Sequence, residues 1–202
     1  MKIRTFRFTP FMTNCFVVSE GDEALVIDPG DVSPDFLACL SQFKVAMVVN
    51  THGHCDHCGG NAAVVAATGA PLAIHRADLP LLEAIEQQGR MFGVPFPSSP
   101  APDIFLEPGQ MIQVGGARFE VRFVPGHSPG HIALAGPGTV FSGDVLFEGG
   151  IGRTDMFGGN YGQLIDSIKT QLLTLPDETV VYCGHGPATT VGAERAGNPY
   201  LV

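Results

Sequence analysis

Basic residues are few in this sequence. Its 202 residues include 11 Lys and Arg against 20 Asp and Glu, which gives a formal net charge of −9 at pH 7. Binding to phosphate groups requires clustered Lys and Arg side chains, and the basic residues here are scattered along the chain. The composition therefore argues against nucleic acid or an anionic membrane surface as a partner.

Long apolar runs are also absent. No uninterrupted apolar stretch approaches the roughly 20 residues that a membrane-spanning helix needs. The N-terminus, Met1 to Arg4, leads directly into an alternating strand pattern and lacks the apolar core of a signal peptide. The five cysteines form an odd set without a regular framework, which indicates free thiols in a reducing compartment. We therefore expect a cytoplasmic protein.

The remaining composition is that of a globular chain, with 45% hydrophobic and 15% charged residues. Short apolar runs predict strands in two blocks, each followed by helical periodicity. This order predicts one α/β domain over residues 1–202, in which two sheets pack together and helices lie outside them. The main expected strands are 45–49, 72–74, 104–106, 111–114, 117–124, 132–135, 139–141 and 179–183, and the main expected helices are 61–68, 77–87 and 161–173.

Residues 89–103 break this pattern. The segment contains four prolines and little periodicity, so it predicts a long loop. Such a loop is either a plain surface connection or a wall or lid of a functional site.

A histidine-rich segment follows one of the buried strands. His52, His54, Asp56 and His57 place three imidazoles and a carboxylate within six residues, in a chain with 7 histidines. His52 and His54 are two residues apart, so in extended backbone they point to the same side. The turn through Gly59-Gly60 can aim the other two beside them. Imidazole and carboxylate are ligands that suit Zn, Fe or Mn, and the segment therefore predicts a metal site.

Further ligand candidates follow other expected strands. His127, Asp144 and His185 each stand beside a glycine at the end of such a strand. Functional loops of α/β folds lie at these positions, and glycine there allows the backbone to approach closely. We therefore expect these side chains to complete the site.

This set of residues resembles the metallo-β-lactamase superfamily, and within it the short bacterial hydrolases of the glyoxalase II-like type. The resemblance covers nearly the whole chain. The motif His52-x-His54-x-Asp56-His57 is specific for the superfamily and less specific for the substrate. The other matching segments are Val26 to Gly30, Gly143 to Phe147, Gly152 to Asp155 and Gly184 to Pro187.

The resemblance implies a four-layer αββα sandwich with two divalent metal ions. The expected metal is zinc, with iron or manganese as alternatives. True β-lactamases of the superfamily lack the aspartate that stands at the position of Asp144 and bridges the two metals. Hydrolysis of β-lactam drugs is therefore a minor possibility. The resemblance implies His52, His54 and His127 on the first metal, Asp56, His57 and His185 on the second, and Asp144 as the bridge.

Three neighbours of this set are further candidates. Asp28 either orients a ligand histidine through its free ring N–H or is a plain turn residue. His131 is expected to support the ligands or to fill a buried structural position, and not to bind metal itself. Arg153 falls where the family has a basic glutathione contact, so it either binds a substrate carboxylate or pairs with Asp155.

The function implied is hydrolysis of a small thioester such as S-lactoylglutathione by a metal-bound hydroxide, with Asp56 orienting the nucleophile. The chain ends about seventeen residues after His185, without the C-terminal helical domain that binds glutathione in the long enzymes. Two tyrosines that help bind glutathione there are replaced by Asp155 and Pro187. The alternative is a persulfide dioxygenase, which uses one Fe(II) on the equivalents of His52, His127 and Asp144. The sequence leaves the oligomeric state open.

Overall fold

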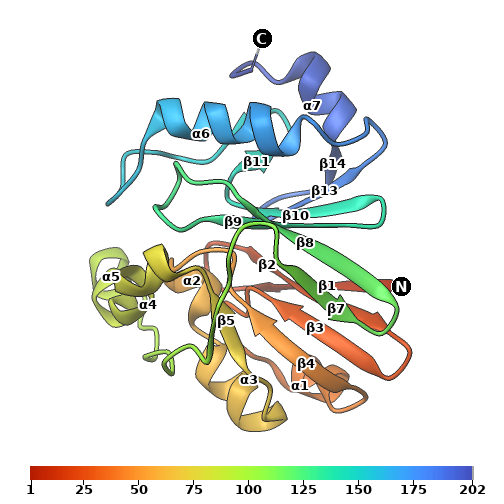
Figure 1. Ribbon diagram of the computed structural model, residues 1–202. Helices are drawn as coiled ribbons and strands as arrows, with labels where there is room; N and C mark the ends of the chain where they lie inside the picture. The colour runs from red at the N-terminus through yellow and green to blue at the C-terminus, as the bar shows by residue number, and fades with distance from the viewer. Residues whose placement is uncertain (202) are drawn as a thin grey trace.

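Strands of both predicted blocks form sheets in the computed structural model, which describes residues 1–201. In the first sheet the strand order follows the chain; β1 to β3 pair antiparallel, and β3 to β6 pair parallel (Figure 1). The strands of this sheet are β1 (Lys2–Phe8), β2 (Thr13–Glu20), β3 (Glu23–Ile27), β4 (Lys44–Val49), β5 (Leu72–Ile74) and β6 (Ile104–Phe105).

The second sheet also has six strands, in the order β14-β13-β10-β9-β8-β7. Only β10 and β13 pair in parallel. A separate hairpin consists of β11 (Leu146–Phe147) and β12 (Gly150–Ile151). The strands of the second sheet are β7 (Met111–Val114), β8 (Ala117–Phe123), β9 (Ile132–Gly136), β10 (Thr139–Gly143), β13 (Val180–Cys183) and β14 (Thr189–Thr190).

The main core lies between the two sheets. Phe16 and Ile27 from the first sheet belong to one buried cluster with Phe119, Leu134 and Phe141 from the second. The rings of Phe16 and Phe141 have centroids 5.1 Å apart, so the two sheets are in direct contact. Burying a side chain of this size stabilises the fold by about 1.5–3 kcal/mol. Because such a core is closely packed, the sandwich forms a rigid base for the loops at its edge.

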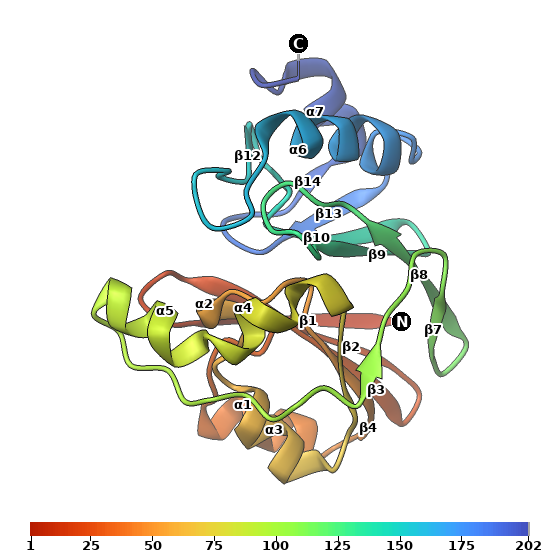
Figure 2. The same cartoon turned by 60° about the vertical axis from the view of Figure 1, so that its left-hand side comes forward.

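Helices cover the outer faces of both sheets, as Figure 1 and the turned view of Figure 2 show. On the first sheet, α1 (Pro34–Leu40) and α3 (Asn61–Thr68) bury Phe36 and Val64 against the strands. On the second, α6 (Tyr161–Ser167), the π-helical segment η2 (Ile168–Leu172) and α7 (Val191–Gly197) complete the fourth layer. The predicted four-layer αββα sandwich is confirmed.

The region after β5 differs from its prediction. In place of one helix over 77–87, the chain forms η1 (Arg76–Asp78), α4 (Leu79–Glu83) and α5 (Ile85–Phe92). The prediction of a loop from residue 89 is therefore wrong for its first four positions. Gly89 does not end α5; it lies where a Cβ would overlap the carbonyl of Val94, and the helix stops at Gly93, whose φ is +70°.

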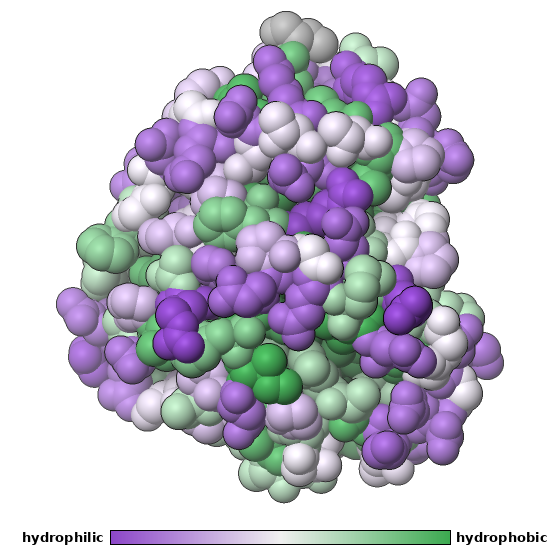
Figure 3. Space-filling model, viewed as in Figure 1, coloured by the Kyte–Doolittle hydropathy of each residue, from purple (hydrophilic) through white to green (hydrophobic). Residues whose placement is uncertain are grey.

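The short helix α2 (Cys55–Cys58) lies together with α4 and α5 at one edge of the sandwich, on the left of Figure 1. Over the face seen in Figure 3, hydrophilic and hydrophobic side chains are interspersed. None of the helices within residues 1–201 is long and apolar enough to span a membrane.

Candidate metal centre

The predicted ligand side chains converge at this edge from both halves of the sandwich. They are carried by loops that begin at the ends of strands, and by the short helix α2. His52 and His54 follow β4, Asp56 and His57 lie in α2, His127 follows β8, Asp144 follows β10, and His185 follows β13.

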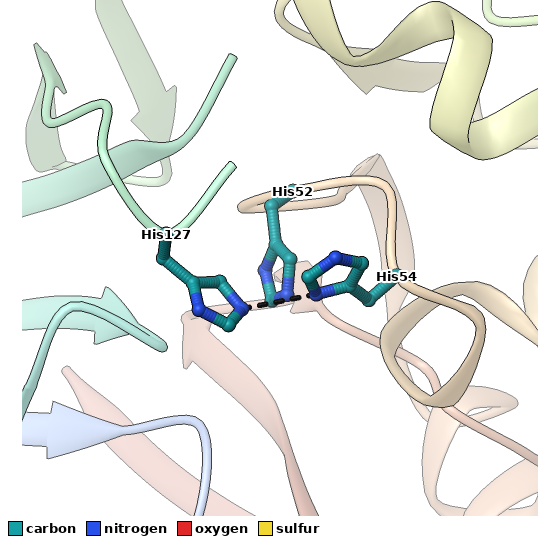
Figure 4. A group of neighbouring side chains, drawn as sticks. All are labelled: His52, His54 and His127. Carbon is teal, nitrogen blue, oxygen red and sulfur yellow. Dashed lines mark hydrogen bonds between the residues drawn. The ribbon is translucent and has the colours of Figure 1, made fainter. Parts of the chain in front are cut away.

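The first group is the triad of His52, His54 and His127. One ring nitrogen from each lies within 4.8 Å of the others. Figure 4 shows the three rings pointing toward one another, with His127 reaching across from the loop of the second sheet. Nδ1 of His54 and Nε2 of His127 are 2.9 Å apart. Three convergent imidazole nitrogens are a donor set suited to one divalent cation.

Hydrogen bonds behind the rings decide which nitrogen faces the centre. Nδ1 of His127 lies 2.8 Å from the carbonyl oxygen of Arg153, and Nδ1 of His185 lies 3.0 Å from that of Phe11. A carbonyl oxygen only accepts, so both Nδ1 atoms carry the proton. Each Nε2 therefore faces the centre, where it can bind a metal once it carries no proton.

Asp28 holds two other histidine rings in place, one directly and one through Thr51. Its carboxylate accepts from the backbone N–H and the hydroxyl of Thr51, both at 2.7 Å, and from Nδ1 of His57 at 3.1 Å. Because the Thr51 hydroxyl donates to Asp28, its oxygen is free to accept from Nδ1 of His52, 3.1 Å away. Asp28 therefore lies behind the candidate ligands, where its hydrogen bonds reach His57 directly and His52 through Thr51, and its own oxygens are already engaged.

The second group consists of Asp56, His57 and His185, whose ligand atoms also lie within 4.8 Å of one another. Asp144 lies between the two groups. Its Oδ1 is 3.4 Å from Nε2 of His57, and its Oδ2 is 3.3 Å from Nε2 of His185 and 3.7 Å from Nε2 of His127. This is the position from which one carboxylate can bridge two cations.

Several buried polar atoms at this edge have no hydrogen-bonding partner within residues 1–201, which shows whether the residues suit a metal. Nε2 of His52, Nε2 of His57 and Oδ1 of Asp144 are buried and form no hydrogen bond within the part of the chain that the structure describes. Leaving such an atom unsatisfied costs about 1–3 kcal/mol. Because all three face the same centre, cations there would satisfy them together, and the residues fit a dinuclear metal site.

The charges differ between the two groups. Burial lowers the pKa of His52 well below its usual value and that of His54 to about 3, so these rings are neutral. Burial also opposes the charge on Asp56, but His57 and a hydrogen bond with His185 lower its pKa to about 2. Burial disfavours a proton on His185, yet Asp144 and Asp56 raise its pKa to about 9. The carboxylates therefore attract cations, and metal binding would displace protons.

His131 has no free nitrogen for a metal. Its Nε2 accepts from the backbone N–H of Asp144 at 3.0 Å, and its Nδ1 lies 3.1 Å from the carbonyl oxygen of Ile132. The ring stacks on His52 with a centroid distance of 4.6 Å. We infer that His131 positions Asp144 and His52 without binding metal.

The turn between β1 and β2 also supports the site, although no sequence motif marks it. The hydroxyl of Thr13 donates to Oδ2 of Asp56 at 2.7 Å. The side-chain amide of Asn14 donates to the carbonyls of Cys183 and Gly186, on either side of His185, both at 2.9 Å. Asn14 and Cys183 are 169 residues apart, and no local pattern marks the pairing.

A second missed pair holds the histidine-rich loop from the helical side. The buried carboxylate of Asp78 accepts from the N–H of Gly53 at 2.9 Å. The amide of Gln88 donates to the carbonyl of Gly53 at 3.1 Å and accepts from the N–H of Cys55 at 3.0 Å. The peptide between His52 and His54 is thus held on both sides.

A pocket of ≈ 450 Å³ opens onto the candidate ligands. Arg153 lines it, and of the two alternatives for this residue the structure shows the pair with Asp155, through two bonds of 2.7 and 2.9 Å. Phe92, at the end of α5, lines the pocket too, so the segment beginning at residue 89 contributes one wall. The other lining residues include Phe11, Phe147, Glu148, Met156 and Pro187.

Replacing Gly184 by Ala is expected to abolish metal binding at the second group. A Cβ at this position would overlap Oδ1 of Asp144 and lie 2.8 Å from Cε1 of His57. Metal content per chain, measured on purified protein, tests this. Gly197→Ala is the matched control, since a Cβ there meets nothing within 4 Å; equal metal content in both variants would contradict the expectation.

Comparison with known proteins defines the class. The model of the Metallo-beta-lactamase superfamily matches residues 8–185, and the chain belongs to this superfamily. It is 36% identical to hydroxyacylglutathione hydrolase GloC of Haemophilus influenzae, over 100% of this chain and 98% of that one. It is 35% identical to the probable metallo-hydrolase YqgX of Bacillus subtilis, over 100% and 98%.

Solved structures show the same fold. A structure of TTHA1623 in a di-iron-bound form is 40% identical, with a TM-score of 0.91 and coverage of 98% of this chain and 100% of that one. The BLEG-1 B3 metallo-beta-lactamase is 34% identical, with a TM-score of 0.92 and full coverage of both chains. The fold and its relatives together define a metal-dependent hydrolase with a His and Asp cluster for divalent metal ions.

Proposed function

We propose that this protein is a glyoxalase II-like hydrolase that cleaves a small thioester with the aid of two divalent metal ions, for which zinc is the first choice. The observation that carries the proposal is the position of Asp144 between two groups of ligand-type side chains. The similarity to hydroxyacylglutathione hydrolase GloC supports thioester chemistry.

The proposed ligands are His52, His54 and His127 for one ion, Asp56, His57 and His185 for the other, and Asp144 for both. When bound, such ions lower the pKa of a bound water from 15.7 towards about 7 and polarise a carbonyl. The chain supplies the orientation: Thr13 holds the Asp56 carboxylate through its Oδ2. Asp56 then serves as the acceptor that orients the attacking water.

The other ionisable side chains of the pocket bear on the leaving group. Apart from the ligands, these are Cys55, Glu148 and Arg153. Burial raises the pKa of the Cys55 thiol to about 12, and a guanidinium keeps its proton in proteins, so neither is a general acid near neutral pH. Glu148 is exposed to solvent on the hairpin and is therefore not a buried proton donor for the leaving group. A leaving group that needs no proton suits this site, and a thiolate, whose conjugate acid has a pKa of about 8.5, is such a group.

A substrate panel tests the proposal. The protein is loaded separately with zinc, iron(II) or manganese(II), and hydrolysis of S-lactoylglutathione, a simple acetyl thioester and a cephalosporin is measured. We expect thioester cleavage with metal and loss of it after chelation. The cephalosporin belongs in the panel because of the similarity to BLEG-1; cleavage of it alone would overturn the proposal in favour of a β-lactamase.

The second candidate is an iron-dependent persulfide dioxygenase. The iron in the di-iron-bound form of TTHA1623, which is 40% identical, keeps this candidate in the comparison, although the dioxygenase uses a single iron. Metal analysis combined with an oxygen electrode separates the two candidates. Two metals per chain and no oxygen uptake with glutathione persulfide favour the hydrolase, whereas one iron with uptake favours the dioxygenase.

A further inference from the structure

We propose that the site is selective for thioesters whose thiol part is neutral and apolar, and that Asp155 withholds Arg153 from the carboxylates of glutathione. This inference rests on the proposed thioester hydrolysis and names the substrate class within it. Two independent features carry it: an apolar collar around the pocket, and the pairing of the basic side chain that lines it.

The collar consists of Phe11, Phe92, Phe147, Met156 and Pro187, which come from separate segments of the chain. Phe11, in the turn before β2, meets Phe92 edge to face, with ring centroids 5.6 Å apart. Both rings remain more than one-third exposed, at 37% and 42%. Exposed aromatic side chains gathered at one opening leave apolar surface that a ligand can cover.

Phe147 extends this surface to the metal centre. Its ring centroid lies 6.3 Å from that of His185. The apolar surface therefore runs from the candidate ligands outward to the exposed rings. The part of a thioester that extends out of the site must contact it, and in a lactoyl thioester the larger, outward part is the thiol.

The charges of the pocket disfavour the alternative thiol, glutathione, which carries two carboxylates. Arg153 is the basic side chain that lines the pocket beside the histidines. Its Nε and Nη2 both bond to Asp155, and this pairing lowers the pKa of the Asp155 carboxyl to about 2. The Nε–Nη2 edge of the guanidinium is thus engaged, and the adjacent Asp155 carboxylate offsets the positive charge that a substrate carboxylate would meet at the remaining edge. Glu148 adds a carboxylate to the wall.

A matched pair of substrates tests the proposal: S-lactoylglutathione and the lactoyl thioester of benzyl mercaptan. Both have the same acyl group and the same bond to cleave. We expect the metal-loaded protein to show a kcat/KM at least about tenfold higher for the benzyl substrate. Phe11→Ala and Phe92→Ala should each lower that value about tenfold and change the value for S-lactoylglutathione much less.

Asp155→Ala should act in the opposite sense. With Arg153 released, kcat/KM for S-lactoylglutathione should rise about threefold, as for loss of an exposed ion pair, and the value for the benzyl substrate should not change. Asp166→Ala and Tyr200→Ala are the matched controls, since both side chains are exposed and lie outside the pocket lining.

The outcomes separate this inference from the function on which it rests. If no thioester is cleaved, the proposed hydrolysis fails and the selectivity fails with it. If thioesters are cleaved but the glutathione substrate is preferred, the selectivity alone is overturned. The same holds if the two phenylalanine variants affect both substrates equally, or if Asp155→Ala lowers the activity on S-lactoylglutathione.

Discussion

Asp144→Asn is expected to lower kcat/KM for thioester hydrolysis by at least about 100-fold, and to reduce the bound metal from two ions per chain to one or fewer. Changes to groups that only support metal ligands already cost 10–100-fold, and Asp144 is itself a proposed ligand of both ions. The amide keeps the volume of the side chain but removes the negative charge between His57 and His127. Elemental analysis of the purified variant and steady-state kinetics measure the two effects.

The substitution keeps one contact that holds this residue in place, because that contact uses its backbone. The N–H of Asp144 donates to His131 whatever the side chain is. Near pH 7 the metal-free variant should nevertheless unfold at a lower temperature than the metal-free wild type, because it lacks the carboxylate that helps to raise the pKa of His185 to about 9; Asp166→Asn serves as the exposed control. Two metals per chain together with an unchanged rate in the Asp144 variant would disprove the dinuclear proposal.

Asp78→Ala should lower the free energy of unfolding by about 3 kcal/mol or more and weaken metal binding about 10–100-fold. Its buried carboxylate accepts from the N–H of Gly53, the hydroxyl of Ser128 at 2.7 Å and the N–H of Gly130 at 2.5 Å. Gly53 belongs to the loop of His52 and His54, and Ser128 follows His127 directly. Without Asp78, the two loops of the first metal group lose the acceptor that they share.

Denaturant unfolding and competition with a chelator measure these effects. Asp78→Asn should be intermediate, since one acceptor oxygen remains while the amide hydrogens face donors. Asp166→Ala controls for the loss of one acidic residue. A variant within about 0.5 kcal/mol of wild type, the range of ordinary surface substitutions, and with unchanged metal affinity would show that Asp78 does not hold the loops.

Much of the fold could be predicted from the sequence because its signals are local. The alternation in β7 and β8 matches their observed burial, with alternate residues of β7 facing the core. The boundary of α5 could not be predicted, because Gly89 normally weakens a helix. Here Gly89 is required by the close passage of Val94 and Phe96, a contact that exists only in the folded chain.

The amino-acid sequence by itself determined the superfamily and the set of candidate ligands. Their residue types and spacing in the histidine-rich segment carry the metal chemistry, and each of the others stands beside a glycine at the end of a strand. Ligand identity is a property of single residues and short loops. It can therefore be recognised before any long-range contact is known.

Only the tertiary structure decided how those ligands are held. Asn14 meets the loop of His185 from the other end of the chain, and Asp78 joins two loops that are 77 residues apart when counted from Gly53 to Gly130. It also decided between the two alternatives for Arg153, because only the folded chain shows the guanidinium bonded to Asp155. These contacts depend on how the two sheets pack, and the packing is set by side chains distributed over the whole sequence.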